Sequence, residues 1–402
     1  MAASRAVVIG SGIGGLTAAA ALHRSGWQVT VLERAASLEP VGAGISLAPN
    51  SQRALDVIGL GDDIRSLAAW QGDGGMRTPS GRWLARTDSA AAADRFGGPL
   101  VLLRRSALIG LLRARLPADA VRTGTPARLV DPGSVGGGPA HVRTASGDIE
   151  ADLVIGADGI GSAVRTKLFP HHPGPSYSGF TTWRVLAPGV GHGFGSHETW
   201  GRGALWGSHP LKDGGVYAYA AAIAPAGVRA DDEKAELVRR YGDWHDPIPA
   251  IIDAVEPDQV LRHDVHHLAD PLPSFHRGRT VLLGDSAHAM VPFLGQGGNQ
   301  AIEDAVVLAH HVTPGKDLGA GLAAYSAARL PRTTAMVRKA AQVSRMTGLS
   351  SAPAVALRNA LMSAVSRLGP GLVLRTFDGI CDWEPPQRTY AARTRAGRTT
   401  RP

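Results

Sequence analysis

The sequence predicts an α/β fold in which a domain of parallel strands and helices is interleaved with a second domain of β-strands, and in which helices follow towards the C-terminal end. Three observations predict this fold. Short apolar runs typical of buried parallel strands recur far apart, at 6–9, 152–155 and 280–283. A glycine-rich turn follows each run. Between the second and third runs, at 171–276, the pattern changes to strands that carry a large share of the few Trp and Tyr residues.

The first glycine-rich turn predicts a Rossmann-like dinucleotide site. The strand 6–9 leads into G-x-G-x-x-G, an alanine-rich helix follows to about His23, and the next strand, 27–32, ends in an acid that can accept both hydroxyls of an adenosine ribose. An ordinary tight turn is the alternative. The predicted cofactor-binding residues are Gly10, Gly12, Ile13, Gly14, Gly15, Glu33 and Arg34.

A second cofactor element begins where the strand 280–283 ends. It runs through an acidic turn at Asp285 and a proline-containing loop to a glycine-rich loop, and then into a helix whose apolar residues reach about His311. Glycines let the backbone approach a flat ligand closely, and the helix N-terminus offers free N–H groups and partial positive charge. We therefore expect an electron-rich cofactor here.

Together these stretches resemble the single-component FAD-dependent monooxygenases of the aromatic-hydroxylase family, which includes salicylate and hydroxybenzoate hydroxylases. The likeness follows the family's order through four stretches: 10–33, 41–45 with 49–50, 156–165 and 284–304. It implies a Rossmann-like FAD-binding domain of the three-layer β/β/α type. It also implies NADH or NADPH as a transient co-substrate and O2 as oxidant. One oxygen atom would pass, through a flavin C4a-hydroperoxide, to an aromatic or other electron-rich small molecule, most simply by hydroxylation. The alternatives are a flavin-dependent reductase or oxidase of the same superfamily and a non-catalytic basic binding protein.

The resemblance assigns roles to residues outside the first turn. Gly44 and Ile45 would run along the isoalloxazine edge, although a plain glycine turn is the alternative. Arg105 would reach the phosphate or ribityl region, with Arg104 as its rival and a surface role open for both. Asp158 would serve the pyrophosphate region through backbone N–H, water or Arg165, because a carboxylate does not bind phosphate directly. In the fourth stretch, Asp285 would bind the ribityl chain and Pro292 would lie beside the substrate. The loop along the pyrimidine edge would contain Gly295, Gly297, Gly298 and Asn299.

Two residues of the aromatic strands are substrate candidates. Arg184 follows Trp183, and its charge could bind an acidic substrate or favour a phenolate, while Tyr217 could hydrogen-bond the same oxygen. Each could instead be an ordinary strand residue. No catalytic base is identified.

The resemblance and the pattern together predict a discontinuous domain arrangement. The FAD-binding domain takes 1–72, 97–170 and 277–350, and the β-sheet substrate domain takes 73–96 and 171–276. A C-terminal helical segment follows at 351–386, and 387–402 is a basic tail expected to be disordered.

Composition limits the remaining possibilities. Net charge is +8, but the arginine-rich tail has no nucleic-acid motif and no interleaved aromatic residues, so we expect no nucleic-acid partner. The single cysteine, Cys381, excludes an intrachain disulfide, and the absence of long apolar runs predicts no membrane span; we expect a cytoplasmic protein. His263, His266 and His267 lie close together in sequence, yet no metal-binding pattern surrounds them. The chain could be a monomer or a homodimer.

Overall fold

A six-stranded sheet forms the centre of the computed structural model, which describes residues 4–38, 44–67, 74–98 and 100–386. The strand order is β17-β18-β11-β1-β2-β7, and every pair is parallel except β17 with β18. The three apolar runs of the sequence form adjacent strands, so the predicted parallel strands are confirmed. The strands are β1 (Arg5–Ile9), β2 (Gln28–Leu32), β7 (Val121–Arg122), β11 (Leu153–Gly156), β17 (His276–Arg277) and β18 (Thr280–Leu282).

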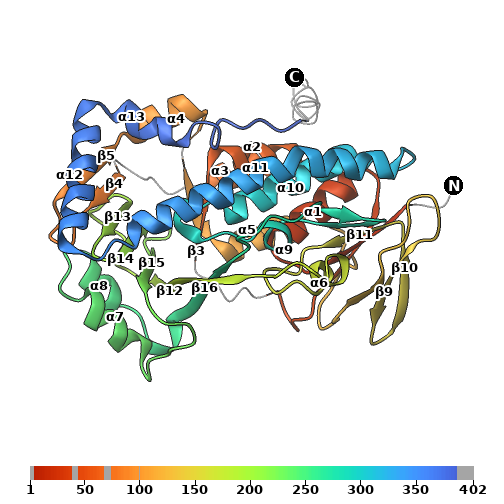
Figure 1. Cartoon of the computed structure of the whole chain (residues 1–402), viewed down its shortest axis with the longest axis horizontal. Helices are drawn as coiled ribbons and strands as arrows, with labels where there is room; N and C mark the ends of the chain where they lie inside the picture. The colour runs from red at the N-terminus through yellow and green to blue at the C-terminus, as the bar shows by residue number, and fades with distance from the viewer. Residues whose placement is uncertain (1–3, 39–43, 68–73, 99, 387–402) are drawn as a thin grey trace, which may run out of the picture.

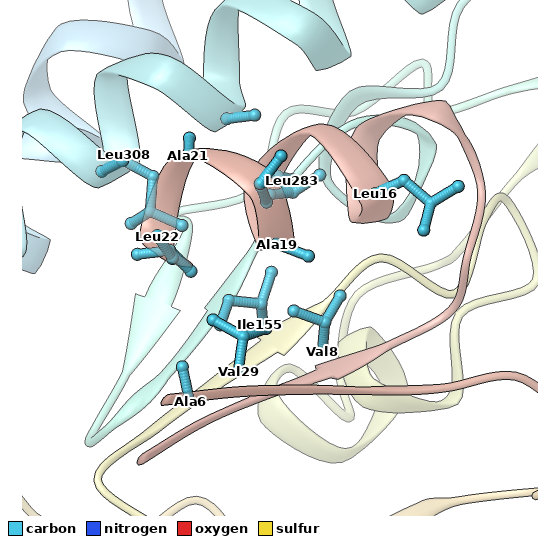
Figure 2. Packing of buried hydrophobic residues seen from close by; sticks show 14 of the residues in the cluster. Ala6, Val8, Leu16, Ala19, Ala21, Leu22, Val29, Ile155, Leu283 and Leu308 are labelled. Carbon is cyan, nitrogen blue, oxygen red and sulfur yellow. The ribbon is translucent and has the colours of Figure 1, made fainter. Parts of the chain in front are cut away.

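Helices cover one face of this sheet, and a small antiparallel sheet belongs to the same core. Helix α1 lies over the strands, and Ala19 and Leu22 are on the side of the helix that faces Val8 and Ile155 (Figure 2). Leu16 belongs to the same buried cluster. These contacts are the α/β layer that the sequence predicted, and the order of layers is β/β/α. The elements are α1 (Ile13–Arg24), α5 (Arg105–Arg113), α6 (Ala163–Leu168), α9 (Asp285–His288), α10 (Gly297–His311), β8 (Arg128–Asp131), β9 (Ala140–Thr144) and β10 (Gly147–Ala151).

A seven-stranded sheet forms the second large unit (Figure 1). Its order is β16-β12-β15-β14-β13-β4-β5, so strands from two distant parts of the chain complete one sheet. Trp183 and Trp206 face the helices α7 (Glu233–Tyr241) and α8 (Ile248–Asp253) in one apolar cluster. The alternate residues face the other way. The strands are β4 (Gly74–Arg77), β5 (Trp83–Thr87), β12 (Ser176–Ala187), β13 (His197–Trp200), β14 (Ala204–Pro210), β15 (Val216–Ile223) and β16 (Leu261–His267).

Local sequence explains where four short helices begin. The stretch 73–96, assigned to the β-sheet substrate domain, ends in helix α4 (Ser89–Phe96), because Asp88 accepts the N–H groups of Ala90 and Ala91 and caps it. Helix α2 (Pro49–Val57) begins with a proline and is followed by α3 (Gly61–Ser66). Helix α7 is capped by Asp232, which accepts the N–H groups of Lys234 and Ala235.

Long helices cross the molecule after α10. Helix α11 (Leu318–Thr347) continues through Pro331. Next to this proline, the Thr333 hydroxyl donates a hydrogen bond to the Arg329 carbonyl. Among the described residues, no helix combines the length and apolar character that crossing a membrane requires. The predicted basic tail, 387–402, lies outside the described residues. The remaining elements are α12 (Ala352–Leu368), α13 (Pro370–Leu374), β3 (Gly44–Leu47), β6 (Val101–Arg104) and the 3-10 turns Pro257–Gln259, Pro292–Leu294 and Arg375–Phe377.

Candidate active site

The turn between β1 and α1 is shaped by glycines that no other residue could replace without movement. Gly10 has φ +105°, and a Cβ there would lie 2.4 Å from the carbonyl oxygen of Ala157. A Cβ on Gly15 would lie 2.1 Å from the carbonyl oxygen of Gly10. Both distances are far below van der Waals contact, so the turn closes only with glycine at these two positions.

Gly12 has the opposite environment. Its added Cβ would have no atom of the described chain within 4 Å, and α1 begins directly after it without a side-chain cap from any described residue. The space in front of the first N–H groups of α1 is therefore open, as an anionic pyrophosphate requires. Ile13 is buried, so only its backbone faces this space.

Glu33 lies across the turn from Gly12. Its carboxylate accepts the N–H and the hydroxyl of Ser11 at 2.9 and 2.6 Å and the N–H of Ala35 at 2.8 Å. Partial burial raises the pKa of Glu33, but these hydrogen bonds and the charge of the exposed Arg34 outweigh it and hold the pKa below its usual value. The side chain is thus an oriented carboxylate at neutral pH. Ser11 is a partner that the sequence reasoning missed.

Asp158 lies beside the same turn and organises its own loop. A Cβ on Gly10 would be 3.2 Å from the Asp158 Cα. The carboxylate accepts the Ser162 hydroxyl at 2.5 Å and the Val164 N–H at 3.1 Å. Arg165 instead donates to the carbonyls of Ser286 and Ile160. Asp158 therefore shapes the end of β11, and its predicted role at the cofactor stays a prediction.

The second glycine-rich element lies against the first. Gly284 has φ +61° where β18 turns into α9, and added Cβ atoms on Gly284 and on Gly14 would lie 3.0 and 3.1 Å from the Cβ of Ala301. Ala301 is the fifth residue of α10, so the N-terminal ends of α1 and α10 are neighbours. One extended ligand can therefore reach both helix ends.

Asp285 and the loop at Gly297 form the far end of this path. The Asp285 Oδ1 would be 3.9 Å from a Cβ on Gly297. The protein atoms packed around Asp285 remove water from its carboxylate and so raise its pKa, while the charges of His288 and Arg105 oppose the shift. Part of the Asp285 side chain is nevertheless exposed to solvent. Pro292 and Gly295 are exposed as well, unlike the buried residues that flank the loop. The exposed groups face a solvent-accessible space.

Gly44 and Ile45 close this space from the other side. A Cβ on Gly44 would lie 2.5 Å from the Tyr217 ring, and Ile45 Cδ1 lies 3.0 Å from the position of a Cβ on Gly298. The structure thus brings Gly44, Ile45, Gly298 and Tyr217 together. Residues 41–43 of the same motif lie outside the described residues.

Asn299 is a clamp. Its Oδ1 accepts the Ala48 N–H and the Ser51 hydroxyl, and its Nδ2 donates to the carbonyls of Ser46 and Gly295. The amide has no remaining strong hydrogen-bonding capacity for a ligand. Its backbone N–H, in the first turn of α10, remains available to one.

Two arginines, both predicted from sequence, meet at Tyr217. The pKa of Arg105 is lowered by burial and by the charge of Arg184, and raised by Asp285 and Tyr217. Burial raises the pKa of Tyr217, and both arginines oppose that shift. Arg184 Nη2 lies 3.2 Å from His263 Nδ1. Within the described part of the chain, the Nε atoms of Arg105 and Arg184 are buried without a hydrogen-bond partner.

The substrate-side wall continues with apolar and aromatic groups. Phe293 meets Phe180 edge-on at 4.8 Å between ring centroids, beside the predicted Pro292. The His209 ring stacks on the rings of Tyr217 and Tyr219, with 6.2 and 5.3 Å between the ring centroids. The Tyr219 hydroxyl donates to Glu198, whose other oxygen accepts the Trp200 ring N–H. An aromatic molecule fits such surroundings.

A buried ion network supports the site from behind, and the sequence reasoning missed it. Glu303 and Asp304 are the seventh and eighth residues of α10, and both are fully buried. Arg329 donates to both at 2.6 Å, and Arg332 donates to Glu303 at 2.7 Å. Asp304 also accepts the Gly284 N–H at 2.9 Å. The network fixes α10 and α11 to the turn that presents Asp285.

Further polar side chains complete the network. Asn50 and Gln300 donate to Glu303, and both also donate to the Gln296 side chain. His288 Nε2 lies 2.5 Å from Asp304. Two features of the sequence could have indicated this network. One helix has acids among its apolar positions, and another contains an Arg-x-x-Arg pattern. No group of His, Cys, Asp or Glu among the described residues could hold a metal ion.

The fold and this site define an FAD-dependent monooxygenase of the aromatic-hydroxylase class. The chain belongs to the FAD binding domain family, which matches residues 3–340. The resemblance and the FAD cofactor predicted from the sequence are confirmed.

Named relatives support the class. The chain is 36% identical over 365 residues to the aurachin C monooxygenase/isomerase of Stigmatella aurantiaca, covering 90% of this chain and 94% of that one. It is 34% identical to the 3-amino-4-hydroxybenzoate 2-monooxygenase PtnB3 of Streptomyces platensis, covering 90% and 93%. The crystal structure of Klebsiella pneumoniae HpxO with FAD and uric acid matches with a TM-score of 0.83 at 28% identity, over 94% and 96% of the two chains. The protein is an NAD(P)H-dependent flavoprotein monooxygenase, and the reductase or oxidase alternative is not favoured.

Proposed function

We propose that this monooxygenase hydroxylates an aromatic ring that carries an anionic oxygen, a carboxylate or a phenolate. The observation that carries the proposal is the pair of buried, unpartnered Nε atoms, within the described chain, of Arg105 and Arg184, two residues whose charges both act on Tyr217. Two guanidinium groups near each other repel unless an anion is shared between them. Relatives named for hydroxybenzoates act on molecules with such groups.

The residues present fit FAD along the path from Glu33 to Gly297. Glu33 would accept the adenosine ribose hydroxyls, and the open N-terminus of α1 at Gly12 and Ile13 would hold the pyrophosphate. Asp285 would bind the ribityl chain, and the N–H groups at Gly297 and Gly298 would face the pyrimidine edge of the ring. Bound FAD supplies the redox chemistry, accepting electrons from NADH or NADPH and activating O2.

The chain itself contributes position, charge and exclusion of water. Gly44 and Ile45 would hold one edge of the ring, close to Tyr217. The α10 N-terminus would stabilise negative charge on the ring by about 0.3–2 kcal/mol without a basic side chain. Arg184 would orient the substrate anion, and Tyr217 would donate a hydrogen bond to the same oxygen. Pro292 and Phe293 would keep water from the reacting carbon.

Several finer assignments belong with this proposal. The sequence contains one dinucleotide fingerprint, so the nicotinamide cofactor would dock transiently and not in a domain of its own. We propose that 1–72, 97–170 and 277–350 form the FAD-binding domain and that 73–96 and 171–276 form the substrate domain. We also propose the cytoplasm as the compartment, since a chain with one cysteine does not need oxidising conditions, and a monomer or homodimer as the assembly.

The test compares charged and neutral versions of one substrate. The wild-type enzyme is assayed for NAD(P)H-dependent hydroxylation with 3-hydroxybenzoate and its primary amide, and with other acid and amide pairs if these fail. We expect R184M to raise KM for the acid about tenfold or more while changing KM for the amide little. R229M is the matched control, because Arg229 is exposed and also bears on His263. An equal change for acid and amide, or no change for either, would overturn the proposal.

A further inference from the structure

The outward face of helix α12 is apolar, which is unusual for a helix at the edge of a protein. Leu357, Leu361, Val365 and Leu368 are 62, 58, 44 and 77% exposed. Their spacing of four, four and three residues places them on one narrow stripe of the helix. The buried residue of α12 is instead Arg358, which donates to the Gly201 and Met346 carbonyls. Helix α12 therefore shows leucines to solvent and turns an arginine inward.

The stripe lies on the periphery of the protein. Figure 1 shows α12 on the outer edge of the molecule, beside β5. A further apolar residue, Ile223, is 48% exposed and lies near Gly203 and Ser350, just before α12 begins. An exposed apolar stripe of this kind is typical of an interaction site.

Charge decides which partner the patch fits. Another face of α12, which shares no residue with the stripe, borders an open groove of about 570 Å³ whose charged lining residues are Arg82, Arg202 and Arg367. Residues 318–377, which include all of α11, α12 and α13, contain several Arg and Lys but no Asp or Glu. The patch is thus an apolar stripe in cationic surroundings.

We propose that α12 docks on a membrane surface rich in anionic lipid, with its leucine stripe among the acyl chains near the headgroups and with Arg82, Arg202 and Arg367 at the phosphates. Interfacial helices combine an apolar face with flanking Arg or Lys, and both attractions add. A second copy that docks through the same face is disfavoured, because it would bring the same arginines together at a segment, 318–377, that has no Asp or Glu. The chain's own residues 387–402 are disfavoured for the same reason, since they carry five arginines and no acid.

The test uses the full-length, FAD-loaded enzyme and sedimentation with vesicles. One set of vesicles is phosphatidylcholine alone, and the other contains phosphatidylglycerol as well. We expect wild type to bind the anionic vesicles and to lose most of that binding at high salt. L361Q/L368Q should bind roughly tenfold more weakly or worse, and R82Q/R367Q should lose the preference for anionic lipid. V228Q/V238Q is the matched control, because Val228 and Val238 are exposed apolar residues away from α12.

The outcomes separate the possible partners. The terminal arginines are present in every variant, so equal vesicle binding by wild type and L361Q/L368Q would assign the binding to them and overturn the proposal. Sedimentation velocity adds a second readout. A dimer that L361Q/L368Q converts to monomer, with no vesicle binding by either, would assign the stripe to a second copy. Unchanged flavin absorbance and melting temperature in the variants establish that they are folded.

Discussion

Gly14 and Ala301 touch where the two halves of the cofactor site meet: a Cβ on Gly14 would lie 3.1 Å from the Cβ of Ala301. Gly14 is the second residue of α1 and Ala301 is the fifth of α10. This contact sets two helix N-termini, far apart in sequence, side by side. A nucleotide held by one helix can therefore place its rings at the other.

The first prediction separates helix packing from cofactor contact. G14A should lower the free energy of unfolding of the apoprotein by about 1–3 kcal/mol, because the new methyl group also meets Leu283 at 2.8 Å. G12A should change it by less than about 1 kcal/mol, since the described chain offers that methyl group no contact. G12A should nevertheless lose FAD affinity, because its methyl group occupies the proposed pyrophosphate space. Urea denaturation and FAD titration measure both quantities. Wild-type FAD affinity in G12A would contradict the assignment.

The second prediction concerns Glu33. Replacing its charge with an amide in E33Q should weaken FAD binding by about 1.5–3 kcal/mol, the range for hydrogen bonds to a charged group. Binding of FMN, which has no adenosine ribose, should be unchanged. Fluorescence titration with each flavin gives the comparison. If FMN and FAD weaken equally, Glu33 acts only by holding Ser11 and Ala35 in place.

The third prediction tests the buried ion network. R329M should lower the free energy of unfolding by about 3–5 kcal/mol, because Glu303 and Asp304 would stay buried with much of their positive charge removed. R345M replaces an exposed arginine of the same helix and should be close to neutral. Denaturation of the two variants in urea decides the matter. Similar midpoints would mean that the network adds nothing to stability.

The fourth prediction is a pH dependence. Burial, helped by the charge of His197, lowers the pKa of His209 to about 3 from 6.5. The unfolded chain therefore binds a proton between these pH values while the folded chain does not. This contribution to stability is present above pH 6.5 and is lost as pH falls, by about 1.4 kcal/mol for each pH unit crossed.

H209F keeps a ring against Tyr219 but cannot titrate, so its free energy of unfolding should fall less than that of wild type between pH 7.5 and pH 5. His197, whose pKa is lowered to about 4, stays in both proteins and leaves a residual slope. Parallel slopes for wild type and H209F would show that His209 is not buried as a neutral ring.

Much of the fold was predictable because its signals are local. The strand, turn, helix and acid between Ala6 and Glu33 are adjacent in sequence, and each has a physical reason to take its form. The same holds for the apolar run that precedes Gly284. Arg105, Arg184, Asp285 and Tyr217 were each proposed separately, and the structure brings them together.

The missed features depend on contacts between distant residues. In the sequence, Glu303 and Asp304 look like ordinary surface acids. Only the folded structure shows that they pair with Arg329 and Arg332 of another helix. Asn299 was expected at the ligand, but its side chain is committed to Ser46, Ala48, Ser51 and Gly295. At 89–96 the local signals were available but were not used: an Asp88 cap and a run of alanines favour a helix within a stretch of strands.

The most direct test of the central claim is oxygen labelling. The FAD-loaded enzyme is supplied with NADH or NADPH, isotopically labelled O2 and the panel of aromatic acids and amides, and products are weighed by mass spectrometry. The account predicts a product that has gained one labelled oxygen atom from O2, in proportion to the reductant consumed. Oxidation of the reductant with hydrogen peroxide as the sole oxygen product, across the whole panel, would contradict it.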